Sequence, residues 1–167
     1  MRPDNANEDR AAVRGLPPLY FVVPLAIALA LQFLVLPLPF ALPAVGFLPA
    51  TALRVAGGAL IGVVGVALFA ATVAAHRRAG NDPHPTSPTR VLITSGPYRL
   101  SRNPGYLGFA LAQTGIAVAV GSFWALGSVV VSLLLAHHLA ALPEEAYLER
   151  KFGERYRAYR EAVRRWL

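Results

Sequence analysis

The chain has 167 residues, of which 55% are hydrophobic and only 15% are charged. Such a composition excludes an ordinary soluble domain, which must cover its surface with polar side chains, and predicts a single membrane domain, residues 1–167. The net charge of +7 does not predict a nucleic-acid partner, because the basic residues flank apolar tracts instead of lying on a polar surface.

Three tracts contain no Asp, Glu, Lys or Arg: residues 15–53, 55–75 and 103–143. Each is long enough to cross a bilayer core about 30 Å thick, since this takes about 20 helical residues. The basic residues lie near the N-terminus, in residues 77–102 or after Pro143, with Arg54 as the one exception. Because cytoplasmic loops retain Lys and Arg, we expect both termini and residues 76–104 to be cytoplasmic.

A polar tail, residues 1–18, precedes two predicted spans within residues 19–75. We interpret the first, about residues 19–40, as a retained span and not as a cleaved signal. Prolines then interrupt the helix and predict an outer loop: Pro37, Pro39, Pro43 and Pro49. The second span, about residues 52–75, carries glycines that allow close helix packing in lipid: Gly57, Gly58, Gly62 and Gly65.

Residues 105–142 carry no formal charge and are too many for one span. We therefore predict a helical hairpin, about residues 105–120 and 123–142, which turns near Gly121 and Ser122. The chain is thus expected to be an all-α integral membrane protein with about four transmembrane helices. A further span within residues 36–53 is rejected, because it would place the basic segment 77–102 on the outer side.

The last segment, residues 143–167, predicts an amphipathic helix along the cytoplasmic interface. Apolar side chains recur there at steps of three or four, with Arg and Glu between them: Leu148, Phe152, Tyr156, Tyr159, Val163 and Trp166. The basic face of such a helix, taken alone, indicates binding to anionic lipid headgroups.

The central loop, residues 76–104, is long for a chain with short connections, and long ordered loops often carry function. At its end Asn103 and Pro104 predict a helix start, with Asn103 as the cap. Pro143, Glu144 and Glu145 predict another helix start, where carboxylates meet the positive end of the helix dipole. Consecutive helical residues point about 100° apart, so one glutamate can face a ligand while the other pairs with a nearby Arg or Lys.

Four short motifs occur in order in the second half of the chain: residues 95–98 (SGPY), 102–108 (RNPGYLG), 144–148 (EEAYL) and 152–156 (FGERY), the last followed by Tyr159. With the charge-free hairpin between the second and third motifs, this half resembles the isoprenylcysteine carboxyl methyltransferase family and its phospholipid methyltransferase relatives. The resemblance covers residues 90–167. It implies a methyltransferase that binds S-adenosylmethionine between the central loop and the C-terminal helix.

The resemblance also implies roles by position. The loop would line the cofactor through its backbone, Tyr98 would contact it, and the start of the third span would form a wall; these residues are Arg90, Val91, Leu92, Ile93, Tyr98, Asn103, Pro104, Gly105 and Tyr106. Glu144 would take the polar end of the cofactor, with Glu145 beside it. The chemistry agrees, since a carboxylate satisfies an ammonium or ribose hydroxyls and aromatic faces accept a cationic sulfur.

The sequence departs from the family at two positions. Asn103 stands where the family often has histidine; asparagine keeps a cap and one hydrogen bond but does not titrate. Ala140 stands where the eukaryotic prenylcysteine enzymes carry an arginine for the substrate carboxylate. A prenylcysteine would therefore lack that partner here, so we expect poor activity toward it unless Arg102, His137 or His138 replaces the arginine.

Methyl transfer is an in-line displacement that depends on alignment and desolvation, so no catalytic side chain is expected when the acceptor is already an anion. His137 and His138 lie in the last span, where ionisable groups are costly and often functional. Neighbouring histidines point to different helix faces, and the chain has no cysteine, so no metal site is expected.

The predicted activity is methyl transfer from S-adenosylmethionine to a lipophilic or amphipathic acceptor that reaches the site from the bilayer. One alternative is an NADPH-dependent membrane reductase, since sterol reductases resemble this family in their C-terminal half. Another is a non-enzymatic membrane module, in which the two glutamates only begin a helix. The sequence fixes neither the acceptor nor the oligomeric state.

Overall fold

The computed structural model describes residues 11–43, 49–84 and 87–167. Within these ranges the regular structure is helical. The β-type pairing found there is a single isolated bridge between Pro39 and Ser122. Parts of the predicted polar tail (residues 1–10), outer loop (44–48) and central loop (85–86) lie outside the described residues. The prediction of an all-α chain is confirmed for the part that the structure describes.

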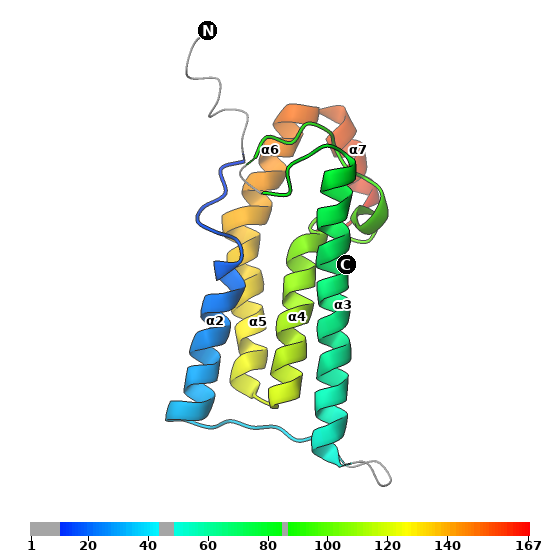
Figure 1. Ribbon diagram of the computed structural model, residues 1–167. Helices are drawn as coiled ribbons and strands as arrows, with labels where there is room; N and C mark the ends of the chain where they lie inside the picture. Colours follow the sequence, from blue (N-terminus) through cyan, green and yellow to red (C-terminus); the bar gives the residue numbers. More distant parts are fainter. Residues whose placement is uncertain (1–10, 44–48, 85–86) are drawn as a thin grey trace.

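Four long helical segments lie side by side, and two shorter helices cover one end of this bundle (Figure 1). In chain order the helices are α2 (Leu19–Ala30), α3 (Ala50–Arg78), α4 (Pro104–Val120), α5 (Phe123–Ala136), α6 (Leu142–Phe152) and α7 (Glu154–Ala162). Helix α2 continues into a π-helical turn, Leu31–Val35, and a 3-10 turn, Gly96–Arg99, precedes α4.

The predicted hairpin is present, and its turn has a simple local cause. Gly121 adopts a left-handed conformation with φ of 70°, which ends α4, and its N–H donates to the carbonyl of Ala117. The Ser122 hydroxyl then accepts a hydrogen bond from the N–H of Ala125 and caps α5. Both residues were identified from the sequence as the turn.

Two helices are long and apolar enough to cross a membrane: Ala50–Arg78, with 29 residues, and the continuous helix Phe123–Phe152, with 30. The other two apolar helices, Leu19–Val35 and Pro104–Val120, are shorter. Large apolar side chains such as Ile27, Leu60 and Val63 lie exposed on the outside of the bundle, as expected for a surface that contacts lipid. A membrane protein therefore fits the fold, and four spans remain a prediction.

Glycines bring α3 and α4 into backbone contact. A Cβ atom added at Gly58 would lie 2.5 Å from the carbonyl oxygen of Gly115, and one added at Gly65 would lie 2.6 Å from that of Gly108. Such distances exclude any side chain there, as in other close helix pairs in lipid. At Gly57 and Gly62 an added Cβ would meet nothing within 4 Å, so of the four predicted glycines Gly58 and Gly65 are the ones whose missing side chain permits the contact.

Arg54, the basic residue outside the three basic segments, lies at the end of the bundle away from α6 and α7. Its Nε donates to the carbonyl of Ala119 at 3.1 Å and its Nη1 to that of Phe40 at 3.2 Å. The guanidinium thus binds a carbonyl near the C-terminal end of α4, where a cation is favourable. This structural role explains why a charge occurs between two apolar tracts.

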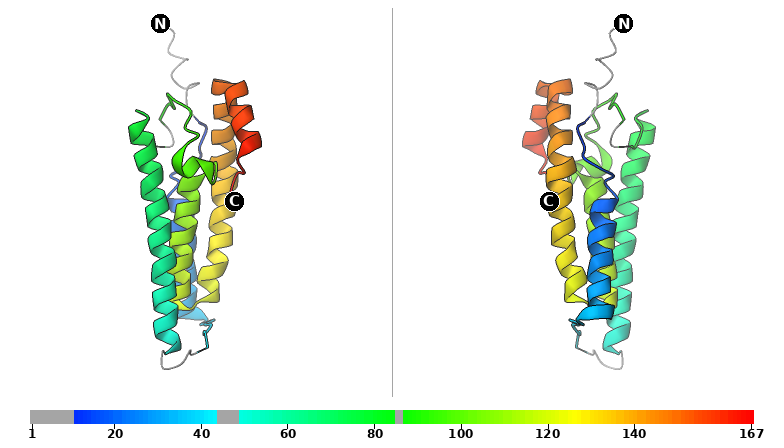
Figure 2. Two further views of the ribbon diagram at one scale, coloured as in Figure 1. Left: turned by 90° about the vertical axis from the view of Figure 1, so that its right-hand side faces the viewer. Right: turned by 90° about the vertical axis from the view of Figure 1, so that its left-hand side faces the viewer.

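The C-terminal part differs from the predicted single helix over residues 143–167. Helix α6 does not begin at Pro143: it continues from α5 through a π-helical turn, His137–Ala141, with helical backbone throughout. Gly153, with φ of 53° and ψ of −125°, separates α6 from α7. After Ala162 the chain runs back beside the bundle (Figure 2). The prediction of a helix start at Pro143 is therefore wrong.

Candidate functional site

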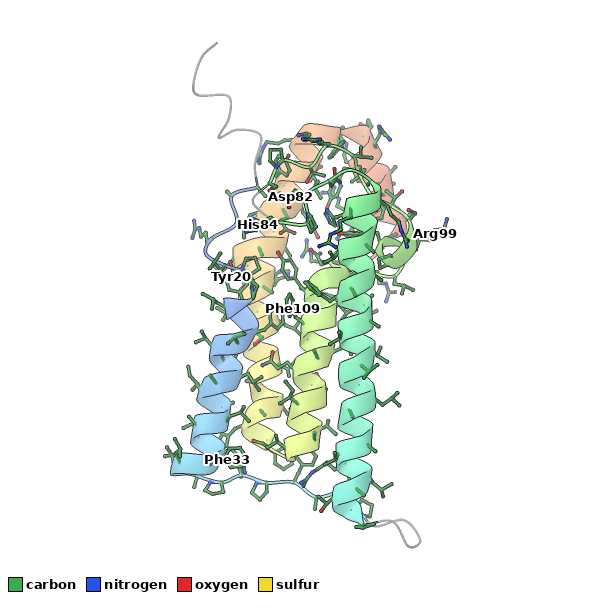
Figure 3. All side chains as sticks on the ribbon, in the orientation of Figure 1. Tyr20, Phe33, Asp82, His84, Arg99 and Phe109 are labelled. Atoms are coloured by element: carbon green, nitrogen blue, oxygen red, sulfur yellow. The ribbon has the colours of Figure 1, made fainter. Side chains whose placement is uncertain are left out.

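A cavity of about 250 Å³ lies at the end of the bundle that α6 and α7 cover, between the loop after α3 and the first turns of α4 and α6. Figure 3 labels three of its lining residues: Asp82 and His84 at the loop and Phe109 deeper between the helices. The cavity combines a polar part with an apolar wall that includes Phe69 and Phe109, whose rings are 4.6 Å apart.

Glu144 and Tyr106 meet across this cavity from α6 and α4. The Tyr106 hydroxyl donates to Oε1 of Glu144 at 2.6 Å, a distance typical of a hydrogen bond to a carboxylate. Both residues line the cavity, and Tyr106 is buried. Among the described residues Tyr106 is the hydrogen-bond donor to Glu144, so the carboxylate can take a further donor from a ligand.

Glu145 points to a different set of partners. Its carboxylate binds the Arg165 guanidinium through both oxygens, at 2.8 and 2.9 Å, and also accepts from Nη1 of Arg102 at 3.2 Å. The side chains of Glu145 and Arg102 are only 10% and 9% exposed. The expected division, in which one glutamate faces the site and its neighbour pairs with arginine, is therefore present.

Asn81 fixes the loop that forms one wall, and sequence reasoning missed it. Its Oδ1 accepts from the N–H groups of Arg90 and Val91 at 2.9 and 3.0 Å, and its Nδ2 donates to the carbonyl of Val91 at 2.7 Å. Asn81 is 4% exposed and follows Gly80, whose positive φ ends α3. The Gly-Asn pair directly after a helix with basic residues in its last turn is the pattern that could have indicated this turn.

Tyr98 lies in a second chain of hydrogen bonds. Its hydroxyl is 2.7 Å from Nε2 of His76, and its carbonyl accepts from the Tyr159 hydroxyl at 2.7 Å. Burial, followed by the nearby Glu144 carboxylate, raises the pKa of Tyr98. The phenol therefore stays protonated at neutral pH and keeps a hydroxyl for hydrogen bonding. His76 was not identified from the sequence.

Several polar atoms of the cavity lining lack partners among the described residues. They are Nδ1 of His76, Nε of Arg102 and the hydroxyl of Tyr156, which lies near Arg102 without meeting hydrogen-bond geometry. Burial raises the pKa of Tyr156 to about 12, so this hydroxyl also keeps its proton. Buried polar groups are rarely left unpaired, so these atoms give the cavity hydrogen-bonding capacity for water or a polar ligand.

Most residues predicted to bind the cofactor line this one cavity: Val91, Leu92, Ile93, Tyr98, Asn103, Pro104, Gly105, Tyr106, Glu144 and Glu145, together with Arg102. Arg90 does not; its backbone is held by Asn81, and its exposed side chain lies at a neighbouring polar depression with Arg77. His137 and His138 do not line the cavity either. Their rings contact each other, and that of His137 lies 6.3 Å from Trp166.

Asn103 occupies the position before α4 but does not act as the predicted side-chain cap. Its carbonyl accepts from the N–H of Leu107, whereas its side chain makes no capping hydrogen bond. Instead Nδ2 donates to the carbonyl of Arg165 at 3.3 Å. The side chain therefore ties the start of α4 to the C-terminal segment.

Ala140 is fully buried and does not line the cavity. It packs in the bundle core with Tyr20, Phe21, Tyr106 and Ala136. An arginine at this position would place a charge among apolar side chains, at a high cost in free energy. The substitution Ala140→Arg is thus expected to disrupt the fold, so it would not supply the arginine that the prenylcysteine enzymes carry at this position.

The fold and cavity define a helical, membrane-type protein with a mixed polar and apolar binding site at one end of its bundle. The sequence profile of the phospholipid methyltransferase family matches residues 53–155, more than half of the chain. The chain therefore belongs to this family, which confirms the resemblance inferred from its motifs and makes it a member of a family of membrane methyltransferases.

Two curated relatives are similar to parts of the chain. An uncharacterized protein of Haemophilus influenzae is 37% identical over 62 residues, which cover 37% of this chain and 98% of the relative. The protein-S-isoprenylcysteine O-methyltransferase of Schizosaccharomyces pombe is 35% identical over 75 residues, or 44% of this chain. The chain spans only 31% of the length of that yeast enzyme. No solved structure shows a significant match.

Proposed function

We propose that this protein transfers a methyl group from S-adenosylmethionine to a lipophilic or amphipathic acceptor at the membrane. The observation that carries this proposal is the cavity that holds the Glu144–Tyr106 pair next to an apolar wall containing Phe69 and Phe109. Family membership supports the methyltransferase class. We infer the identity of the cofactor and the class of acceptor from the residues that line the cavity.

The described residues fit the methyl donor. Glu144 offers a carboxylate to its ammonium or ribose hydroxyls, and the rings of Tyr98 and Tyr106 offer aromatic faces to its cationic sulfur. The loop residues Val91, Leu92 and Ile93 would line it, and the turn of Asn103, Pro104 and Gly105 would form the facing wall. Bound there, S-adenosylmethionine supplies an electrophilic methyl group.

The protein itself contributes positioning and exclusion of water. Asn81 holds the loop by three hydrogen bonds, and the Tyr106 hydroxyl orients Glu144. Apolar residues such as Phe69, Val73 and Phe109 would exclude water from the reacting atoms and accommodate the hydrocarbon part of the acceptor. Such positioning contributes through alignment, so the reaction needs no nucleophilic side chain.

The same proposal includes the arrangement in the bilayer. Four helical segments would span the membrane, with both termini and residues 76–104 at the cytoplasmic side, because this side carries the basic residues Arg77, Arg78 and Arg90. The cavity would then lie at the cytoplasmic ends of α3 and α4. There it would meet a water-soluble cofactor from one direction and a lipid-dissolved acceptor from the other.

Methyl transfer can be tested without knowing the acceptor. Purified protein would be incubated with S-adenosylmethionine labelled in its methyl group and a total membrane lipid extract, and the organic phase would be counted. We expect label in a lipid product for the parent and a strong reduction for Glu144→Gln. Equal label with and without the protein, across extracts rich in phospholipid and in isoprenoids, would argue against a lipophilic acceptor.

A further inference from the structure

Arg102, Glu145 and Arg165 form a cluster at the polar end of the cavity in which two guanidinium groups share one carboxylate. With all three groups ionised, the cluster carries one excess positive charge. The Arg102 side chain is 9% exposed, and its Nε has no partner among the described residues. A buried cation that lacks a full set of partners favours the binding of an anion.

The two arginines bind Glu145 unequally. Arg165 uses Nε and Nη2 to engage both carboxylate oxygens, at 2.8 and 2.9 Å, whereas Arg102 makes one bond of 3.2 Å. Paired bonds of this kind are the strongest arrangement of guanidinium and carboxylate. Arg165 thereby leaves Arg102 only loosely held by Glu145. Arg102 lines the cavity, and Arg165 does not.

We infer that Arg102 is a carboxylate-binding subsite of this cavity, and that Arg165 is a positioning residue that keeps Arg102 available by occupying Glu145. This inference rests on the proposed function, since it concerns a ligand of the same cavity. Without the Arg165 guanidinium, both oxygens of Glu145 would be free to take Arg102 in a paired arrangement. Arg102 would then have less hydrogen-bonding capacity for a ligand.

The side chain of Arg165 can be tested separately from its backbone. The carbonyl of Arg165 accepts from the Ser101 hydroxyl at 2.9 Å, and that of Arg164 accepts from the N–H of Arg102 at 3.0 Å. These bonds fix the C-terminal segment to the loop and persist when a side chain is truncated. Arg165 also lies beyond residue 155, where the family match ends. The positioning role proposed for its side chain therefore rests on the hydrogen bonds to Glu145 and not on the family match.

Two ligands could supply the carboxylate: the amino-acid end of the methyl donor or an acidic acceptor. Isothermal titration of the protein with S-adenosylmethionine and with its decarboxylated analogue isolates the first source, because the two compounds differ only in that group. We expect the parent to prefer S-adenosylmethionine by about tenfold to a hundredfold, the range for a charge-assisted hydrogen bond. Arg165→Ala should reduce this preference severalfold or more.

Two further variants separate positioning from general damage. Arg164→Ala, which removes an exposed guanidinium from the neighbouring position, should keep the parental preference. The double variant Glu145→Gln with Arg165→Ala should recover it, because neutral glutamine no longer competes for Arg102. A double variant as poor as the single one would overturn the positioning role. If Arg165→Ala does not fold, Arg165→Lys should give an intermediate preference, since an ammonium cannot engage both oxygens as a guanidinium does.

The second arm uses a prenylcysteine and its carboxamide as acceptor probes, again by titration. If the acceptor supplies the carboxylate, Arg165→Ala should lower the affinity for the prenylcysteine relative to its carboxamide and leave the donor preference unchanged. If neither pair of compounds responds to Arg165→Ala while the parent binds S-adenosylmethionine, this inference is wrong and the proposed function stands. If the parent binds no form of the methyl donor, the proposed function itself fails.

Discussion

The backbone N–H of Arg14 donates a hydrogen bond of 3.0 Å to the carbonyl oxygen of Leu139. Four residues after Leu139 comes Pro143, which has no N–H to offer this carbonyl in a regular helix. The Tyr20 hydroxyl in turn donates to the carbonyl of Arg14. The segment before α2 thus supplies the partner that proline removes, which lets one helix run from the bundle into the wall of the cavity.

The contact between α3 and α4 gives a first prediction. Gly65→Ala should lower the free energy of unfolding in mixed micelles by about 1 to 3 kcal/mol, the usual cost of overpacking, because the new Cβ would lie 2.4 Å from the backbone nitrogen of Ala112. Gly57→Ala is the matched control, since its Cβ meets nothing within 4 Å and alanine favours helix. Equal stability of the two variants would argue against the close α3–α4 contact.

Asn81 gives a second prediction, on ligand binding. Asn81→Ala removes one donor and one acceptor that serve three backbone bonds to Arg90 and Val91, so the loop should lose its fixed position. Leaving buried backbone groups unpaired costs about 1 to 3 kcal/mol, so we expect roughly tenfold weaker binding of S-adenosylhomocysteine by titration. Thr114→Ala, which removes a hydroxyl that donates to the carbonyl of Ala110 away from the cavity, is the control and should bind as the parent does. Unchanged affinity in Asn81→Ala would show that the loop does not need this anchor.

Substitution of the two neighbouring glutamates should have different effects, on ligand binding for Glu144 and on stability for Glu145. Glu144→Gln keeps the shape of the side chain but loses the carboxylate, so S-adenosylhomocysteine binding should weaken by about 1.5 to 3 kcal/mol. Glu145→Gln instead leaves two arginines without their common anion and should lower stability, by about 3 kcal/mol for a buried pair, with a smaller effect on binding. Titration and thermal unfolding of both variants measure the two effects. Lower stability in Glu144→Gln together with weaker binding in Glu145→Gln would contradict the roles proposed for the two residues.

The orientation in the bilayer can be measured by cysteine labelling, because the parent contains no cysteine. Arg90→Cys and Pro43→Cys place single thiols at exposed positions at opposite ends of the bundle. In intact cells a membrane-impermeant maleimide should label position 43, and position 90 should react only after permeabilisation. Labelling of position 90 from outside would overturn the predicted four-span orientation.

Much of the helical framework could be predicted because its causes are local. The absence of charge over residues 105–142 and the turn chemistry of Gly121 and Ser122 placed the hairpin within a few residues. The continuation of the helix through Pro143 could not be predicted in the same way. It accompanies a hydrogen bond from Arg14, which is far away in sequence.

The site shows the same division. The motifs indicated Tyr106 and Glu144, and the geometry of a helix predicted that Glu145 would turn toward arginine. Asn103 was expected to cap its own helix, whereas its side chain binds the carbonyl of Arg165, a contact that depends on the path of the C-terminal segment. Ala140 could not be assigned to the core from its position near the glutamates, because the π-helical turn His137–Ala141 alters which residues face the cavity.

Binding of S-adenosylmethionine in the cavity is best examined by titrating the detergent-solubilised protein with S-adenosylhomocysteine and with NADPH. We predict saturable binding of S-adenosylhomocysteine, weakened in Glu144→Gln, and no binding of NADPH. Binding of NADPH in place of S-adenosylhomocysteine would favour a reductase, and binding of neither by a folded protein would rule against a methyltransferase site.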